Sequence, residues 1–327
     1  MIYMVRILRA AAVQHVARLG QINENMERVR PLIERAVNEG AKLVALPEMS
    51  LSGYTLNKEM WDYSEPVDGP TEKWLKEKAM KHQIFLCGGL TQHEGSDFYN
   101  TYLIVSPEGE TIGRVRKTQT EFNIHRAGPL DGHIVDTDSF RIGIGICADT
   151  HMTFFPKYMR EKEIDLLLSP HAWPILYKLS KFANKIDIVE QEKRVKDYAS
   201  FYAKMLGVPT VFIDQTGSIE GKKWPGITGK LMDIDCFRYP GFTTIATPQE
   251  VIAQLDDSED FIVADINMDN KEPPKSIPNY HGLVHSGSLL FRLLVYGIDL
   301  PLSKLKYKLS ENERKKAIKI KYTIGLK

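Results

Sequence analysis

Short apolar runs alternate with amphipathic segments along most of the chain, which has 327 residues. Apolar runs of strand length predict β-strands at residues 5–14, 42–47, 84–90, 140–147, 164–169 and 208–213. Apolar residues recur at helical spacing in three longer segments, which predict helices at residues 23–39, 71–82 and 184–206.

Turn signals and the later apolar runs indicate the fold class. Pro107-Glu108-Gly109 separates apolar runs at residues 101–106 and 110–116, so this segment is predicted to be a β-hairpin. Residues 224–236 and 261–266 are expected to close the sheet region. Hairpins mixed with strand–helix–strand units predict an α/β layered sandwich.

The first predicted helix carries its own boundary signals. Asn23 is a candidate N-terminal cap and Gly40 a candidate C-terminal cap. Pro31 lies inside the segment and is expected to bend or restart the helix, because proline lacks the N–H that an interior helical position donates.

The distribution of charged residues is uneven only near the C-terminal end. The chain is 43% hydrophobic and 26% charged with a net charge of +1, which does not indicate a protein that coats nucleic acid or a membrane. From Ser303 onward, nine lysines or arginines outnumber Glu311 and Glu313. We interpret this basic tail as a solvated edge strand or as an arm packing on the domain or on a partner subunit. Binding of the tail to nucleic acid or an anionic surface would require strong salt dependence.

Cysteine usage and the N-terminal residues bear on the compartment. The cysteines, Cys87, Cys147 and Cys236, are few and odd in number, which argues against a disulfide framework and for a reducing compartment. The N-terminus runs directly into a strand-like stretch without a secretory-signal pattern, and no apolar run is long enough to span a bilayer. The expected location is therefore the cytoplasm.

Three chemically reactive side chains each stand at the end of a strand-like run. They are Glu48, Lys117 and Cys147. Singly, each has an ordinary interpretation: a loop glutamate, a solvated lysine and a buried structural cysteine. Together they provide a base, an oxyanion-stabilising cation and a nucleophile, which is the equipment for covalent hydrolysis of a carbon–nitrogen bond.

The segments around these residues follow one another in a recognisable order: Leu46-Pro47-Glu48, Tyr99-Asn100-Thr101, Arg116-Lys117-Thr118 and Gly145-Ile146-Cys147-Ala148-Asp149. Further matches are the strand ending at Gln14, Ser169-Pro170-His171-Ala172-Trp173, and Gly226 to Asp233. In residue type, order and spacing the set resembles the nitrilase superfamily of carbon–nitrogen hydrolases. The resemblance covers Val5 to about Asn267. Residues 1–270 are therefore expected to form a carbon–nitrogen hydrolase domain, and residues 271–327 a C-terminal extension.

The resemblance implies a four-layer α-β-β-α sandwich that forms a homodimer or higher homo-oligomer and uses no cofactor or metal. It assigns Glu48 as general base and Cys147 as nucleophile. Lys117, with the backbone N–H of Ala148, would stabilise the oxyanion. Glu121 matches a second glutamate of the family, because it lies seven residues before Gly128, and would orient Lys117 or the leaving group.

Departures from the family pattern bear on the substrate. Asp149 is kept after the cysteine, but His151 stands where arginine is usual, so the pocket wall is expected to differ. True nitrilases usually have Trp-Glu directly after the cysteine, and this chain does not, which favours an amide or N-carbamoyl substrate over a nitrile. The candidate substrate-binding residues are Tyr54, Ala148, Asp149, His151, His171 and Trp173.

The leading hypothesis is hydrolysis of a small linear amide or N-carbamoyl compound through a cysteine thioester, with release of ammonia or an amine. Nitrile hydrolysis, acyl transfer to an amine, and a non-catalytic dimeric interaction module are the alternatives. His281 and His285 are spaced for a metal if they lie on a helix, but Pro278 and Gly282 favour a loop there, so a metal-dependent hydrolase is disfavoured.

Overall fold

The computed structural model describes residues 5–121, 124–179, 185–231, 233–277 and 293–324. Its larger sheet has the strand order β16-β1-β2-β4-β5-β6, with β3 paired to β4. These strands are β1 (Ile7–Gln14), β2 (Leu43–Ala45), β3 (Glu65–Pro66), β4 (Phe85–Glu94), β5 (Asp97–Val105), β6 (Thr111–Arg116) and β16 (Asp260–Asn267). The sheet is mixed, because β1, β2 and β4 run parallel while β5 and β6 form the predicted hairpin.

The second sheet has the strand order β15-β14-β11-β9-β8-β7. Its strands are β7 (Ile134–Asp136), β8 (Arg141–Ile144), β9 (Leu166–Pro170), β11 (Thr210–Ile213), β14 (Thr244–Ala246) and β15 (Val251–Gln254). The three central neighbours β8, β9 and β11 are parallel. Their carboxyl ends therefore lie at one edge of the sheet, where ligands commonly bind in open α/β sheets.

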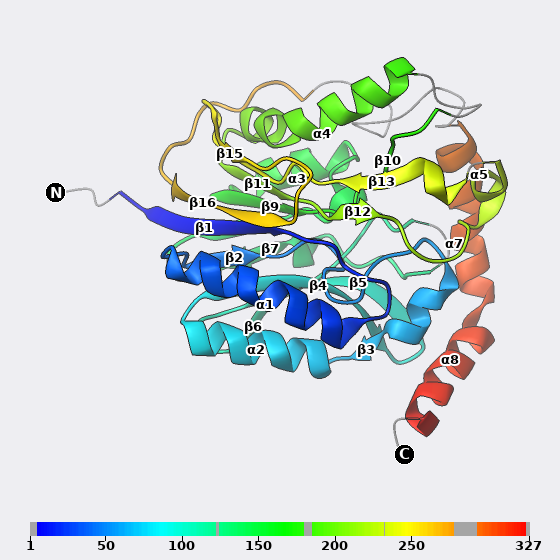
Figure 1. Ribbon diagram of the computed structural model, residues 1–327. Helices are drawn as coiled ribbons and strands as arrows, with labels where there is room; N and C mark the ends of the chain where they lie inside the picture. Colours follow the sequence, from blue (N-terminus) through cyan, green and yellow to red (C-terminus); the bar gives the residue numbers. More distant parts are fainter. Residues whose placement is uncertain (1–4, 122–123, 180–184, 232, 278–292, 325–327) are drawn as a thin grey trace.

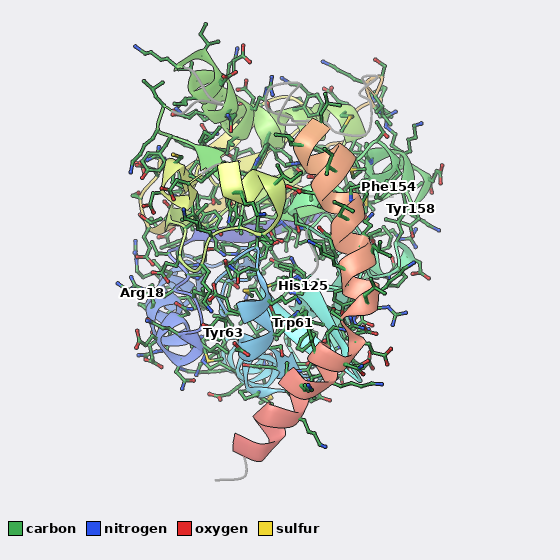
Figure 2. All side chains as sticks on the ribbon, turned by 90° about the vertical axis from the view of Figure 1, so that its right-hand side faces the viewer. Arg18, Trp61, Tyr63, His125, Phe154 and Tyr158 are labelled. Carbon is green, nitrogen blue, oxygen red and sulfur yellow. The ribbon has the colours of Figure 1, made fainter. Side chains whose placement is uncertain are left out.

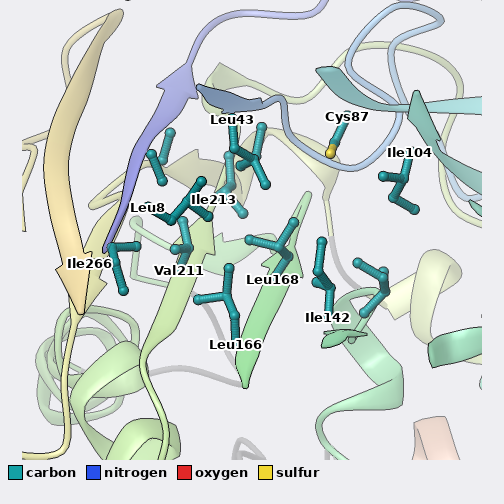
Figure 3. Close-up of a cluster of buried hydrophobic side chains, with 14 of the residues drawn as sticks. Leu8, Leu43, Cys87, Ile104, Ile142, Leu166, Leu168, Val211, Ile213 and Ile266 are labelled. Atoms are coloured by element: carbon teal, nitrogen blue, oxygen red, sulfur yellow. The ribbon is translucent and has the colours of Figure 1, made fainter. Parts of the chain in front are cut away.

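The two sheets face each other and bury a common core (Figure 1, Figure 3). Alternate strand residues point into it, including Leu8 and Leu43 from the first sheet and Leu166, Leu168 and Val211 from the second. In the central strands, the alternate residues point outward and are buried under helices. Both faces of each central strand are thus apolar, which explains the continuous apolar runs in the sequence.

Helices cover the outer face of each sheet (Figure 1). Helices α1 (Ile22–Asn38) and α2 (Pro70–His82) pack on the first sheet. Helices α3 (Phe154–Glu161) and α4 (Lys185–Leu206) pack on the second. The layer order is helices, sheet, sheet, helices, and the expected α-β-β-α sandwich is confirmed. Short 3-10 helices lie between these elements: η1 (Lys58–Tyr63), η2 (Asp131–His133) and η3 (Cys147–Asp149).

Helix α1 departs from its predicted N-terminal cap and does not restart at Pro31. Asn23 is not its cap, because the helix already begins at Ile22 and Gln21 holds the cap position. Pro31 lies inside one uninterrupted helix. The C-terminal signal is confirmed, since Gly40 follows the last turn with a φ of +87° and its N–H donates to the Val37 carbonyl.

The strand-like run at residues 224–236 was wrongly predicted to close the sheet. It contains helix α5 (Gly226–Leu231) and the turn η4 (Ile234–Cys236). A separate small sheet of order β10-β13-β12 lies beside this segment. Its strands are β10 (Ile175–Leu176), β12 (Thr216–Ser218) and β13 (Phe237–Pro240). The strands that follow complete the two large sheets: β14 and β15 in the second, and β16 in the first.

The edge strand suggested for the basic tail is also wrong, because that region is helical. After the π-helical turn η5 (Leu293–Asp299) come α7 (Leu300–Leu309) and α8 (Glu311–Ile324). In α7, Leu300, Ser303 and Tyr307 are buried at helical spacing on one face. Tyr307 packs with Trp61 and Phe98, and Figure 2 shows the tail helices, in salmon, passing Trp61. Among the described residues, none of the helices combines the length and apolarity that crossing a bilayer requires.

Candidate active site

The loops that leave the strands bring the three reactive residues together. Glu48 follows β2, Lys117 directly follows β6, and Cys147 opens η3 after β8. The segment from His171 to Trp173 follows β9. Because the two sheets face each other, groups at the ends of strands from both sheets meet on one side of the core.

Glu48 is fully buried and both of its carboxylate oxygens are bonded. Lys117 Nζ and Asn100 Nδ2 donate to Oε1 over 2.8 and 2.6 Å. The backbone N–H of Ala172 donates to Oε2 over 2.8 Å. The Gln215 side chain donates to the Glu48 carbonyl over 2.7 Å, which fixes the backbone as well. Glu48 is therefore held rigidly by donors from four separate segments.

Lys117 is fully buried and lies between two carboxylates. Its Nζ is 2.8 Å from Glu48 Oε1 and 2.5 Å from Glu121 Oε1. Burial lowers the pKa of Lys117, but the neighbouring Glu121 and Glu48 carboxylates outweigh it and raise this pKa well above its ordinary value. Lys117 is therefore held as a positive charge between the two carboxylates.

Glu121 and Tyr54 join this network, while contact of Tyr54 with substrate stays a prediction. The Tyr54 hydroxyl donates to Glu121 Oε2 over 3.0 Å. Burial raises the pKa of Glu121, and the ion pair with Lys117 opposes that rise. Glu121 thus bridges Lys117 to Tyr54, and it lies where it can orient the lysine.

Cys147 occupies a tight turn with an unusual backbone. Its φ is +42°, which non-glycine residues rarely adopt and which recurs at functional sites. The Cys147 carbonyl accepts from both the N–H and the hydroxyl of Thr150, which closes the turn. Burial raises the pKa of the Cys147 thiol well above its ordinary value; nearby Glu48 adds to this and Lys117 opposes it. The resting group is a thiol, so it needs a base to become a nucleophile.

Asp149 connects the cysteine turn to the lysine segment. It is fully buried, and its Oδ1 accepts from the backbone N–H groups of Thr118 and Gln119 over 3.0 and 2.5 Å. Burial raises the pKa of this carboxyl. These bonds to the backbone give Asp149 a positioning role, while contact with substrate stays a prediction. Ala148, between Cys147 and Asp149, lies in η3, where its N–H is next to the reactive thiol in sequence.

Three of the residues predicted to bind substrate, His151, His171 and Trp173, form one cluster of rings, and their contact with substrate stays a prediction. The His151 and Trp173 rings lie 4.4 Å apart between centroids, and His171 lies 5.7 Å from Trp173. His171 is fully buried and packs edge-on against Tyr198 of α4, at 4.9 Å. Trp173 is only partly buried. His171 is therefore an interior residue of this cluster, and Trp173 is its more exposed member.

Sequence reasoning missed three polar residues of this site: Asn100, Asp214 and Gln215. Asn100 was noted only as part of a motif, although it binds Glu48 directly. Asp214 is fully buried and accepts from the N–H groups of Trp173 and Gln215 over 3.0 and 2.9 Å. A signal was available, because Asp214 and Gln215 follow the apolar run of β11 as Glu48 follows that of β2.

The described residues hold no cluster of three or more His, Cys, Asp or Glu side chains arranged to bind a metal ion. His281 and His285, the pair considered for a metal, lie outside the described residues.

The chain is similar to known proteins in sequence and in fold. It is 28% identical over 202 residues to omega-amidase NIT2 of Pongo abelii, covering 55% of this chain and 73% of that protein. A carbon–nitrogen hydrolase from Helicobacter pylori G27 has the same fold, with a TM-score of 0.70, 19% identity and coverage of 80% of this chain and 90% of that chain.

A second solved structure is a mutant of the amidase from Nesterenkonia sp. AN1, with the acetamide moiety of fluoroacetamide covalently added at the active-site cysteine. Its TM-score is 0.62 at 17% identity, with coverage of 80% of this chain and 91% of that chain. The family model described as Carbon-nitrogen hydrolase matches residues 9–272, most of the sequence. The chain therefore belongs to the carbon–nitrogen hydrolase family, the nitrilase superfamily.

Proposed function

We propose that this carbon–nitrogen hydrolase cleaves a small linear amide or N-carbamoyl compound through a thioester on Cys147. The observation that supports this most strongly is the buried network in which Lys117 contacts both Glu48 and Glu121, next to the Cys147 turn. Buried charges are costly to maintain, so a network of this kind is a candidate for function rather than for stability.

In the first half of the reaction, Glu48 takes the proton of the Cys147 thiol and the sulfur attacks the amide carbon. A base is needed because the pKa of this thiol is raised by burial. The carbonyl oxygen becomes an oxyanion, which Lys117 Nζ and the N–H of Ala148 stabilise. The carbon–nitrogen bond then breaks, the nitrogen takes the proton from Glu48, and ammonia or an amine leaves the thioester behind.

In the second half, water replaces the leaving group. Glu48 removes a proton from this water, which attacks the thioester carbon, and Lys117 again stabilises the oxyanion. The carbon–sulfur bond breaks and the sulfur regains its proton. The products are a carboxylic or carbamic acid and the free enzyme. Glu121 keeps Lys117 in place through both halves, since it holds the ammonium over 2.5 Å.

Two arguments favour an amide or N-carbamoyl substrate over a nitrile. Ala148 follows the cysteine where true nitrilases usually have tryptophan. The similar proteins include omega-amidases and an amidase whose cysteine takes up an acetamide group. We expect a pocket wall that includes His151 and Trp173 to select the acyl chain.

The test combines intact-protein mass spectrometry with ammonia release from a panel of small amides, N-carbamoyl compounds and nitriles. We expect one class to release ammonia, with a mass increase on Cys147 equal to the acyl group. Cys147→Ala should abolish both signals. Cys236→Ala is the matched control, because Cys236 is a free thiol outside the network and its loss should leave both signals unchanged. Wild-type turnover by Cys147→Ala would overturn the proposal.

A further inference from the structure

Asp214 lies at the same sheet edge as the nucleophile. It follows β11, the third of the parallel neighbours β8, β9 and β11, and Ile213 is paired with Pro170 of β9. The other two strands lead into Cys147 and into the segment from His171 to Trp173. Three adjacent strands therefore present three polar segments side by side at their carboxyl ends, and the mechanism above gives Asp214 no role.

Only one oxygen of the Asp214 carboxyl accepts hydrogen bonds. Oδ1 accepts from the N–H groups of Trp173 and Gln215, at 3.0 and 2.9 Å. Oδ2 is buried and has no hydrogen-bond partner among the residues that the structure describes. Buried side-chain oxygens are rarely left without a donor, and an exception beside a reactive group calls for a ligand or an ordered water.

The same backbone segment holds Asp214 and the general base. Consecutive N–H groups, of Ala172 and Trp173, donate to Glu48 Oε2 and Asp214 Oδ1. Gln215, next to Asp214, donates to the Glu48 carbonyl. Asp214 is also close enough to Cys147 to contribute to the raised pKa of that thiol. A group bound to Oδ2 would therefore lie near the reacting bond.

The charges around the site favour a cation at that position. In the described network, Glu48, Glu121, Asp149 and Asp214 supply four carboxyl groups, and Lys117, which is bonded to the first two, supplies one positive charge. Burial raises the pKa of Asp214 well above its ordinary value, and Glu48 adds to this. An ammonium group would supply the missing N–H donor and reverse the electrostatic penalty on the carboxylate.

We propose that Asp214 Oδ2 binds a protonated amine on the substrate, so that the substrate is a small amide or N-carbamoyl compound with a cationic end. This inference rests on the proposed function, because it places the cation in the same pocket as the scissile bond. It makes Asp214 a specificity-determining residue.

The test uses primary amides that are matched in length and differ in terminal charge. For a five-carbon acyl chain, the set is the cationic 5-aminopentanamide, its uncharged isostere hexanamide and the anionic glutaric acid monoamide. Shorter and longer ω-amino amides are each paired with the alkyl amide of the same length. The wild-type protein should hydrolyse an ω-amino amide with higher kcat/KM than its alkyl isostere. The anionic amide should be the poorest substrate.

Asp214→Asn is the informative variant, because asparagine keeps an oxygen for the N–H groups of Trp173 and Gln215. We expect kcat/KM for the preferred ω-amino amide to fall by roughly 10- to 100-fold, the value of one hydrogen bond to a charged group. The kcat/KM for the alkyl amide should fall by less, so that the ratio between the two amides, and with it the preference of the wild-type protein for the cationic end, is lost. Asp265→Asn is the control, because Asp265 is an exposed strand carboxylate paired with Arg9, and it should affect neither substrate.

Equal losses for both amides, or none, would overturn the inference while leaving the proposed hydrolysis intact. Binding of these amides to Cys147→Ala, measured by isothermal titration calorimetry, tests Asp214 recognition independently of hydrolysis. If the inference is right, Cys147→Ala binds the ω-amino amide more tightly than its isostere, and the added Asp214→Asn change removes the difference. That result would support Asp214 recognition even if no amide were hydrolysed by the wild-type protein.

Discussion

The backbone N–H of Gln119 donates a 2.5 Å hydrogen bond to Oδ1 of Asp149, and this bond ties the lysine segment to the cysteine turn. Asp149→Ala removes the acceptor for this donor and for Thr118. Leaving such donors unsatisfied costs about 1–3 kcal/mol each, so the free energy of unfolding should fall by at least that amount. The kcat/KM should fall as well, because Lys117 and Cys147 lose their common anchor.

Urea unfolding and steady-state kinetics on the same preparation measure both effects. Asp136→Ala is the matched control, because Asp136 is an exposed carboxylate whose ion pair with Arg141 lies at the surface, where such pairs contribute little. Normal stability and normal kcat/KM in Asp149→Ala would show that Asp149 does not hold the two segments together.

The reactivity of Cys147 should depend steeply on pH. Burial raises the pKa of this thiol above its ordinary value of 9.0, so the thiolate is a minor species throughout the neutral range. Because the thiolate is the nucleophile, alkylation of Cys147 by iodoacetamide should accelerate about tenfold per pH unit, with no plateau below pH 9. Peptide mass spectrometry at the Cys147 position provides the rate. A plateau below pH 8 would mean a stabilised thiolate and would remove the need for Glu48 as base.

The sequence indicated the central residues because each stands where an apolar run ends. Glu48, Lys117 and Cys147 are polar interruptions at strand ends, and in this fold strand ends meet. Glu121 was found through the family resemblance, because it lies seven residues before Gly128. These features depend on local sequence, so they could be found without knowing which strands are neighbours.

The contacts that could not be predicted from the sequence are those between segments far apart along the chain. Asn100 and Gln215 both bind Glu48, although Gln215 is 167 positions away along the chain. Short apolar stretches were equally ambiguous, since residues 224–236 proved to contain α5 rather than a strand. In α7, Leu300, Ser303 and Tyr307 share one buried helical face. The alternation of lysines in this segment had suggested a strand instead.

Gly89 should be required for the position of the general base. It lies on β4 against the loop that follows Glu48, and a Cβ at this position would meet the Met49 nitrogen at 2.4 Å. Gly89→Ala must therefore displace backbone, at a typical overpacking cost of about 1–3 kcal/mol. Both the free energy of unfolding and kcat should fall. Gly132→Ala is the control, because a Cβ there would have no neighbour within 4 Å. Equal behaviour of the two variants would refute this steric argument.

Asp214→Asn should stabilise the protein at neutral pH. Burial raises the pKa of Asp214 above its ordinary value of 3.8, so the folded protein binds this proton more tightly than the unfolded chain does. Between those two pKa values the unfolded chain holds fewer protons, and stability falls as pH rises. Asparagine cannot ionise, so the stability difference between variant and wild type should be smallest near pH 4 and should grow toward pH 8. Urea unfolding at several pH values measures it, with Asp265→Asn as the exposed control. A difference that does not change with pH would mean that Asp214 is already ionised and compensated in the folded protein, as it would be with a resident cation bound at Oδ2.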